Sequence, residues 1–168
     1  MNILLFGKTG QVGWELQRAL VPLGNLIALD VHSTDYCGDF SNPEGVAETV
    51  RSIRPDIIVN AAAHTAVDKA ESEPKFAQLL NATSVEAIAK AANEVGAWVI
   101  HYSTDYVFPG TGEIPWQETD ATAPLNVYGE TKLAGEKALQ KHCAKHIIFR
   151  TSWVYAGKGN RSEERRVG

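Results

Sequence analysis

Residues typical of disulfide-rich or metal-stabilised proteins are scarce in this sequence. Its 168 residues include two cysteines, Cys37 and Cys143, whose spacing matches no metal site and which are too few for a disulfide framework. Such cysteine usage is typical of a reducing, cytosolic setting. The sequence also lacks any long apolar run, and no basic segment precedes its first apolar residues. We therefore expect a cytoplasmic protein with neither a membrane span nor a signal peptide.

An excess of charge of one sign is absent as well. Sixteen lysines and arginines against twenty aspartates and glutamates give a net charge of −4, and no basic cluster occurs before residue 161. Nucleic acid and membrane are therefore not expected as partners. Hydrophobic residues make up 44% of the chain, and a domain of this length buries roughly 70% of its unfolded surface. The composition thus predicts one folded domain with a sizeable core.

Strand-like and helix-like segments alternate along the chain. Short apolar runs predict strands at residues 2–6, 26–30, 56–60, 97–103 and 146–150. Helical spacing predicts helices at 11–20 and 127–142, and a helical region from about 67 to 95 that is broken near Pro74. A capping box at Ser41–Glu44 opens a further helix that ends near Pro55. This alternation predicts the α/β class, with a Rossmann-like, doubly wound parallel sheet.

A glycine-rich segment joins the first predicted strand to the first predicted helix. Gly7, Gly10 and Gly13 suit a tight turn, close approach of the backbone to a pyrophosphate, and close packing of the helix on the strand. Gln11 and Val12 lie at the helix N-terminus, where unpaired N–H groups attract anions. A plain glycine-rich turn is the alternative. The position between a strand and a helix favours a dinucleotide-binding loop.

Acidic residues follow the second predicted strand. Asp30 lies where a carboxylate can bind the diol of an adenosine ribose, although a surface turn is the alternative. An acid at this place repels a 2′-phosphate, and no arginine follows closely. Taken alone, these two features favour NAD over NADP. Asp39 and Phe40 lie in the next loop, where the aromatic ring either flanks an adenine or packs in the core.

Three polar residues predict an active site for a carbonyl and alcohol pair. Tyr128 and Lys132 are four residues apart on a predicted helix, so that phenol and ammonium share one face. A free tyrosine has a pKa of about 10, and a neighbouring cation lowers that pKa toward neutrality. Thr104 follows the fourth predicted strand, on the same edge of the sheet as the glycine loop. Each feature alone is also typical of an ordinary helix face or strand end, but their order favours catalysis.

The glycine pattern together with Tyr128-x-x-x-Lys132 resembles the extended short-chain dehydrogenase/reductases. Three longer strings, at 103–108, 126–136 and 150–155, narrow the resemblance to members that reduce the 4-keto precursor of dTDP-L-rhamnose for cell-surface polysaccharide such as lipopolysaccharide O-antigen. The resemblance implies hydride transfer from NADPH or NADH to C4 of the dTDP-sugar. It implies that Tyr128 protonates the new alkoxide, that Lys132 holds the nicotinamide ribose, and that Thr104 orients the carbonyl.

The resemblance also implies binding residues and an assembly. Cofactor contacts are expected at Gly7, Gly10, Gln11, Val12, Gly13, Asp30, Asp39, Phe40, Ala63, His64, Thr65, Tyr128 and Lys132. Substrate contacts are expected at Val67, Thr104, Asp105, Val107 and Trp153. A homodimer is implied for the full-length protein. Some members bind Mg²⁺ between subunits through acidic residues later in the chain, and no metal ligand is expected here.

Two other function classes remain open. A non-catalytic dinucleotide-binding subunit of the same fold would regulate a partner, although a regulator has no need of Thr104, Tyr128 and Lys132 together. A sugar-nucleotide epimerase or dehydratase on the same scaffold differs chiefly in whether the cofactor is consumed stoichiometrically.

Residues 161–168 do not fit the pattern that precedes them. The apolar pattern stops after Asn160, and the octapeptide that follows equals the translation of a common DNA-sequencing adapter. We therefore expect residues 1–160 to be an incomplete NAD(P)-binding Rossmann domain, largely without its substrate subdomain, followed by a non-native tail. The piece alone is expected to be inactive, because the missing subdomain would close over the sugar and exclude water.

Overall fold

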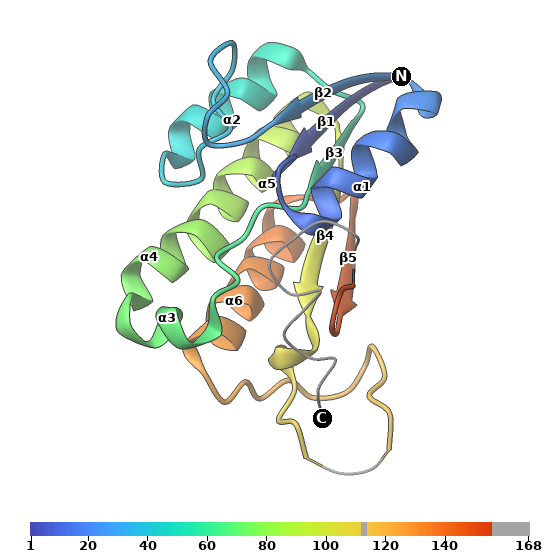
Figure 1. The fold of residues 1–168 in the computed structure, drawn as a ribbon. Coiled ribbons are helices and arrows are strands. Elements are labelled where there is room, and N and C mark those ends of the chain that lie inside the picture. Colours follow the sequence, from blue (N-terminus) through green and yellow to red (C-terminus); the bar gives the residue numbers. More distant parts are fainter. Residues whose placement is uncertain (112–113, 156–168) are drawn as a thin grey trace.

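One parallel sheet forms the centre of the structure, a computed structural model that describes residues 1–111 and 114–155 (Figure 1). The strands lie in the order β2-β1-β3-β4-β5, and every neighbouring pair is parallel. Their bounds are Asn2–Phe6 for β1, Asn25–Leu29 for β2, Ile57–Asn60 for β3, Trp98–Thr104 for β4 and His146–Thr151 for β5. The predicted α/β class with a Rossmann-like sheet is confirmed. The predicted non-native tail, residues 161–168, lies outside the described residues.

Helices cover both faces of this sheet. On one face lies α1 (Gln11–Leu20), and on the other lie α2 (Pro43–Ile53), α5 (Ser84–Val95) and α6 (Val127–His142) (Figure 1). The shorter segments are η1 (Val21–Leu23) after α1; α3 (Val67–Ser72), α4 (Pro74–Gln78) and the π-helix η2 (Leu79–Thr83) before α5; and the 3-10 helix η3 (Asp105–Val107) after β4. The predicted bounds of β1, α1 and α6 agree with the structure to the residue.

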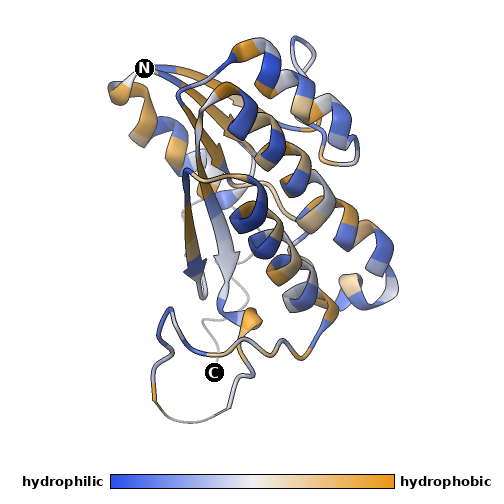
Figure 2. Cartoon of the chain, turned by 180° about the vertical axis from the view of Figure 1, so that it is seen from behind, coloured by the Kyte–Doolittle hydropathy of each residue, from blue (hydrophilic) through white to orange (hydrophobic). Residues whose placement is uncertain are grey.

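The core lies in two layers because successive side chains of a strand alternate between the faces of a sheet. Leu4 and Phe6 of β1 pack with the helices α2 and α5, whereas Ile3 and Leu5 pack on the opposite face with Leu16 of α1. Figure 2 shows the strands as largely hydrophobic, between helices whose outer faces are polar. The central strands are therefore covered on both sides, as their apolar sequences predict.

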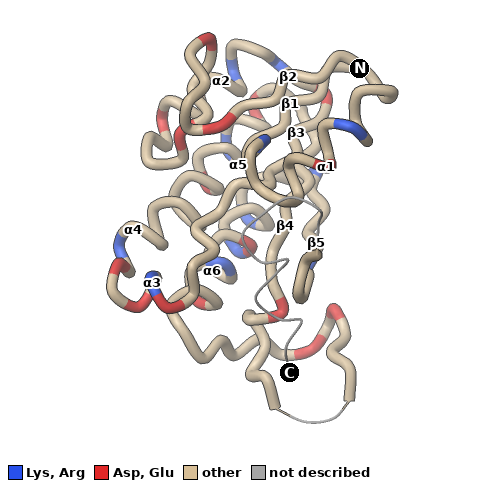
Figure 3. The backbone as a smooth tube through the Cα atoms, in the orientation of Figure 1, with Lys and Arg blue, Asp and Glu red and all other residues tan. Residues whose placement is uncertain are grey.

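Lysine and arginine positions are interspersed with aspartate and glutamate positions along the described chain (Figure 3). Arg51 of α2, for example, pairs with Glu44 and Glu94 at 2.8 Å each, and both carboxylates are largely exposed. Among the helices of the described residues, none has the length and apolar character needed to cross a bilayer.

Two helix starts test the sequence-based expectations. Asn42 caps α2, because its side chain accepts a hydrogen bond from Gly45 N at 3.0 Å. The predicted capping box at Ser41–Glu44 is therefore wrong by one residue: the N–H and hydroxyl of Ser41 both bind the carboxylate of Asp39, at 2.8 Å. The predicted break near Pro74 is confirmed, since α3 ends before it and Pro74 opens α4.

Two glycines allow α6 to lie close to neighbouring segments. A Cβ at Gly135 would lie 2.1 Å from Asn81 O in η2, and a Cβ at Gly129 would lie 2.3 Å from Tyr106 O in η3. No side chain fits at such distances from backbone atoms. The position of α6 against the segments that follow β3 and β4 therefore depends on these glycines.

The variant Gly135→Ala should lower the free energy of unfolding by roughly 1–3 kcal/mol, as overpacking does, although alanine is favoured over glycine in a helix by about 1 kcal/mol. Gln140→Ala, at an exposed position of the same helix, is the matched control and should change stability by less than about 0.5 kcal/mol. Urea denaturation of both variants measures the difference. A Gly135→Ala protein as stable as its parent would contradict the close contact with η2.

Candidate cofactor and active site

The glycine loop follows β1 at the edge of the sheet where the parallel strands end. Gly7 has a φ of +85°, and a Cβ there would lie 2.7 Å from Ala61 C. A Cβ at Gly13 would lie 2.0 Å from Gly7 O, whereas a Cβ at Gly10 would approach only Gly7 O, at 3.5 Å. Gly7 and Gly13 are therefore required for the turn and for helix packing. The loop is open beside Gly10, where a ligand can approach the start of α1.

Two buried nitrogen atoms in the described residues have no hydrogen-bond partner, namely Gln11 Nε2 and His64 Nδ1. Gln11 begins α1, and its N-cap Gly10 has no side chain to accept a hydrogen bond from the free N–H groups of the first turn. His64 belongs to the loop after β3. A buried polar group without a partner costs about 1–3 kcal/mol. These residues fit a polar ligand such as a dinucleotide, which would supply the missing partners.

Asp30 lies directly after β2 and is buried. Its Oδ1 accepts hydrogen bonds from His32 N at 3.0 Å and from Ser33 Oγ at 3.2 Å, and lies 3.8 Å from Lys8 Nζ. Lys8, in the glycine loop, also donates to Ser33 Oγ at 3.2 Å. A search for basic residues after Asp30 did not find this cation, because Lys8 lies earlier in the sequence, in the loop between β1 and α1. The acid at the predicted ribose site therefore has a positive charge beside it.

The loop after β2 contains the other two expected adenosine contacts. The ring of Phe40 is 5% exposed and packs edge-to-face on Phe6, with 5.3 Å between ring centroids. Its carbonyl accepts a hydrogen bond from Ser84 Oγ at 2.5 Å. Of the two alternatives for the ring, packing in the core is the one that the structure shows. The carboxylate of Asp39 holds the loop through Ser41.

Thr104 ends β4, and η3, which follows it directly, lies against α6. Its Oγ1 donates to Asp105 Oδ1 at 3.1 Å and accepts from Tyr106 N at 3.2 Å. The ring of Tyr106 lies edge-to-face on the ring of Tyr128, with 5.6 Å between centroids. Tyr128 is in the first turn of α6. Thr104 and Tyr128 are thus linked through Tyr106 at the carboxyl end of β4.

Lys132 lies one turn after Tyr128, and its side chain is buried at 2% exposure. Its Nζ donates to Tyr102 O of β4 at 2.6 Å and lies 3.4 Å from His101 Nε2. Burial lowers the pKa of Lys132 to about 8, and the carboxylate of Glu136 acts in the opposite direction. A lysine fixed in this way near Tyr128 is suited to stabilise a phenolate when it carries its proton.

Asn81 is a site residue that the sequence pattern did not reveal. Its Oδ1 accepts from His64 N at 2.8 Å, and its Nδ2 donates to His64 O and to Thr131 Oγ1, both at 3.1 Å. It lies in the π-helix η2, a type of irregularity often found at functional sites. One amide side chain therefore fixes the loop after β3 against α6. A single asparagine within a helical region has no periodicity that would have indicated this role.

A buried ion pair connects α6 to β5. Arg150 Nη2 donates to Glu136 Oε2 at 2.7 Å, and Arg150 Nε donates to Glu136 Oε1 at 3.1 Å. The hydroxyl of Ser103 donates to the same carboxylate, whose side chain is 1% exposed. The guanidinium also lies 4.9 Å from the ring centroid of Phe108. These contacts hold the ends of β4 and β5 against the helix that bears Tyr128 and Lys132.

The remaining predicted contacts differ in exposure. Those whose side chains are half-buried or exposed are Val12, Ala63, Thr65, Val67, Asp105 and Trp153. Val107 is fully buried with Phe108 and Leu133. Because the side chain of Val107 is not exposed, it can affect the predicted substrate site only by supporting the residues around it.

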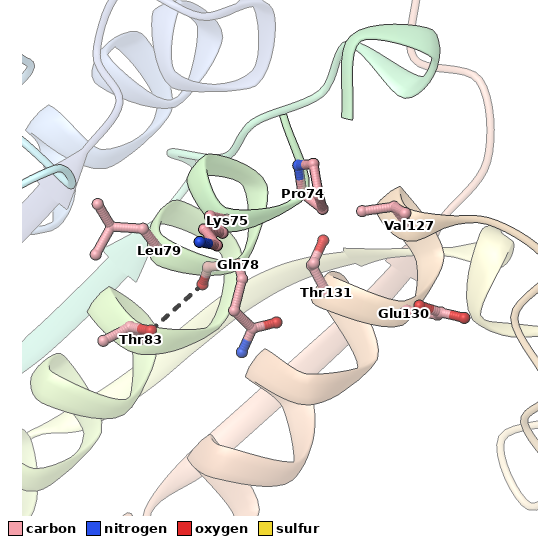
Figure 4. A pocket seen from close by; sticks show the side chains of 8 residues that line it. All are labelled: Pro74, Lys75, Gln78, Leu79, Thr83, Val127, Glu130 and Thr131. Atoms are coloured by element: carbon pink, nitrogen blue, oxygen red, sulfur yellow. Dashed lines mark hydrogen bonds between the residues drawn. The ribbon is translucent and has the colours of Figure 1, made fainter. Parts of the chain in front are cut away.

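A separate open pocket of about 530 Å³ lies between α4, η2 and α6 (Figure 4). Its lining residues are Pro74, Lys75, Gln78, Leu79, Thr83, Val127, Glu130 and Thr131. This set contains no residue of the predicted cofactor and substrate contacts. The candidate site is therefore the edge where the strands end, and not this pocket.

Comparison with known proteins identifies the family of this chain. The RmlD substrate binding domain family matches residues 1–164. The chain belongs to this family.

Several known proteins align with about 95% of this chain. The chain is 93% identical over 160 residues to dTDP-4-dehydrorhamnose reductase of Escherichia coli (strain K12) and 87% identical to that of Salmonella typhimurium; each alignment covers 95% of this chain and 54% of the relative. A solved dTDP-4-dehydrorhamnose reductase from Bacillus anthracis in complex with NADP has a TM-score of 0.88 at 38% identity, covering 95% of this chain and 56% of that one. The chain spans about half the length of the curated relatives it matches. These names confirm the resemblance drawn from the longer strings.

In this RmlD-family chain, Arg150→Met should lower the free energy of unfolding by roughly 3–5 kcal/mol, because it leaves the Glu136 carboxylate buried without a counter-ion. Arg51→Met is the matched control, since Arg51 also contacts two carboxylates at 2.8 Å but on the surface. The Arg51→Met variant should lower the free energy of unfolding by less than about 1 kcal/mol. Urea denaturation gives both values. Equal losses in the two variants would show that the Glu136 carboxylate does not depend on Arg150.

Proposed function

We propose that this chain is the cofactor-binding part of an NAD(P)H-dependent dTDP-4-dehydrorhamnose reductase. The observation that carries the proposal is the buried Lys132, which is bonded to the backbone of β4 one turn from Tyr128 and close to the strand end at Thr104. The names of relatives at 93% and 87% identity support the substrate class. The NADP complex of the Bacillus anthracis protein supports the cofactor class.

The proposed reaction adds a hydride to C4 of dTDP-4-dehydrorhamnose and a proton to its oxygen, giving dTDP-L-rhamnose. The reduced nicotinamide, when bound, supplies the hydride. Tyr128 donates its phenolic proton to the oxygen as negative charge develops there. Lys132, when protonated, stabilises the phenolate that remains. Thr104 turns its hydroxyl hydrogen from Asp105 to the same oxygen and so orients the carbonyl.

The cation beside Asp30 supports the use of both NADPH and NADH. The Asp30 carboxylate is an acceptor for the hydroxyls of an unmodified ribose, whereas the Lys8 ammonium offers a counter-charge to a 2′-phosphate. Because the two groups lie 3.8 Å apart, the repulsion expected from Asp30 alone is offset. The sequence-based preference for NAD is therefore not part of the proposal.

The proposal for the whole protein includes four further properties. These are a homodimer, a cytoplasmic location, a role in cell-surface polysaccharide synthesis, and Mg²⁺ at the dimer interface through residues beyond this chain. The 168-residue piece without its substrate subdomain is proposed to be inactive.

The variant Tyr128→Phe, in the full-length protein, should lower kcat for NADPH oxidation with dTDP-4-dehydrorhamnose by about 10²- to 10⁴-fold, because the general acid is lost. The change removes one oxygen and should leave thermal unfolding close to that of the parent. Absorbance of NADPH at a series of substrate concentrations measures the rates.

Three outcomes of this experiment would contradict the proposal. Equal rates in the parent and Tyr128→Phe would contradict the proposed proton donor. Conversion of the sugar without stoichiometric loss of NADPH would instead indicate an epimerase or dehydratase. Binding of NADPH with no conversion of any sugar nucleotide would indicate a regulatory subunit.

The variant Lys8→Ala should raise the KM for NADPH by about tenfold or more, because a charge-assisted hydrogen bond to phosphate contributes roughly 1.5–3 kcal/mol. The KM for NADH should change less, since NADH has no 2′-phosphate. Lys69→Ala, at an exposed position of α3, is the control. The same increase in KM for both cofactors would contradict a role for Lys8 at the 2′-phosphate.

A further inference from the structure

Three polar side chains from different elements form a row that ends at Lys132. Asn60 ends β3, His101 lies in β4, and Lys132 lies in α6. Asn60 Nδ2 lies 3.0 Å from His101 Nδ1, and His101 Nε2 lies 3.4 Å from Lys132 Nζ. All three residues are at most 2% exposed. The row therefore lies in a region where each donor needs an acceptor from the protein itself.

The backbone fixes the direction of the first hydrogen bond in this row. Ala62 N donates to Asn60 Oδ1 at 3.0 Å, and a backbone N–H has no ability to accept. The oxygen of the Asn60 amide is thereby committed to Ala62. The group that faces His101 is the amide nitrogen, which donates, so His101 Nδ1 must accept.

The second contact follows from the chemistry of a neutral imidazole. Burial lowers the pKa of His101 well below its usual value, so the ring is neutral. A neutral ring that accepts at Nδ1 carries its single hydrogen at Nε2. That hydrogen points at Lys132 Nζ.

This arrangement satisfies only one charge state of Lys132. An ammonium has three donors and no acceptor, so it would place a donor against the Nε2–H of His101. A neutral amine accepts from His101 with its lone pair and still donates to Tyr102 O, which lies 2.6 Å away. Moving the histidine hydrogen to Nδ1 does not help the ammonium, because two donors would then meet at Asn60.

We propose that Asn60 and His101 are positioning residues that favour the uncharged form of Lys132 in the protein without cofactor, and that Lys132 takes up a proton when the cofactor binds. The second part rests on the proposed function, since a dinucleotide brings ribose hydroxyls and phosphate oxygens as new acceptors. The cation that stabilises the Tyr128 phenolate is then complete only in the loaded site.

The ionisable groups near Lys132 act in two directions. Burial lowers the pKa of Lys132 to about 8, in the same direction as the row of hydrogen bonds. Glu136, one turn along α6, favours the ammonium, but its carboxylate is shared with Arg150 of β5 and Ser103 of β4. His101 is the titratable group that faces Lys132 from β4, and Tyr128 precedes it by one turn on α6 itself.

The test is a measurement of the pKa of Lys132 by NMR in full-length protein without cofactor. The protein carries lysine labelled with ¹³C at Cε, and the signal of Lys132 is assigned by its loss in Lys132→Met. Asn60→Asp is nearly isosteric and reverses the row: a carboxylate accepts from both Ala62 N and His101 Nδ1, so that Nε2 can accept from an ammonium. His101→Gln places an amide oxygen within reach of Lys132 without adding charge.

We expect the pKa of Lys132 to rise in both variants, by at least one unit in Asn60→Asp, which is a tenfold increase in proton affinity. An unchanged pKa in both would overturn the proposal. A rise in Asn60→Asp with none in His101→Gln would assign the effect to the added charge and would also overturn it. If Asn60→Asp does not fold, His101→Gln decides alone. Because no substrate or cofactor is present, this result is independent of whether the protein reduces a dTDP-sugar.

The second part of the proposal is tested by calorimetry. Titration of NADPH at pH 8.5 in two buffers of different ionisation enthalpy reports the protons taken up on binding. We expect uptake of a large fraction of one proton by the parent and much less by Asn60→Asp, in which Lys132 is already charged. Equal uptake by parent and variant would overturn the coupling between cofactor binding and Lys132.

Discussion

The hydrogen bond from Lys132 Nζ to Tyr102 O, 2.6 Å long, is the contact on which the candidate site depends. It joins the helix that bears Tyr128 to the strand that ends at Thr104, so the phenol and the hydroxyl are placed by one rigid connection. The bond requires α6 to lie close to its neighbours, which Gly129 and Gly135 allow by having no side chain. Loss of either close approach would displace the reactive groups without touching them.

Three buried polar residues lie on the two turns of α6 that form the site. Thr131, Lys132 and Glu136 are all buried, and each is bound by a different part of the fold: Asn81 of η2, the backbone of β4, and Arg150 of β5. Apolar residues of the same volume would in many cases stabilise a helix at least as well as such buried polar contacts do. The polar contacts do fix the rotation of α6 about its axis and its position along that axis, because each hydrogen bond requires one particular geometry. The helix is therefore positioned by directional bonds near the active site and by apolar packing of Leu139 farther along.

Hydropathy periodicity was sufficient to predict the framework of the fold. The bounds of β1, α1 and α6 follow from local spacing, and the break at Pro74 follows from the missing N–H of proline. The start of α2 was missed by one residue, because Ser41 and Asn42 are both good caps. In the structure Ser41 binds Asp39 instead, which leaves Asn42 as the cap. The glycine loop, Tyr128 and Lys132 were found because their spacing is local. Asn81, the pair of Lys8 and Asp30, and the row of Asn60 and His101 were not, because each depends on side chains from distant parts of the sequence that meet only in the folded sheet.

The carboxyl edge of the sheet is the part of the described structure with the most incomplete hydrogen bonding. Gln11 and His64 each have a buried nitrogen without a partner. Both are on segments that follow β1 or β3, where a dinucleotide would lie in this fold. Groups that are satisfied only when a ligand arrives lower the stability of the empty protein and raise its affinity for that ligand by the same free energy. The same residues that make this edge the least favourable part of the free protein thus favour the binding of a polar, acceptor-rich cofactor.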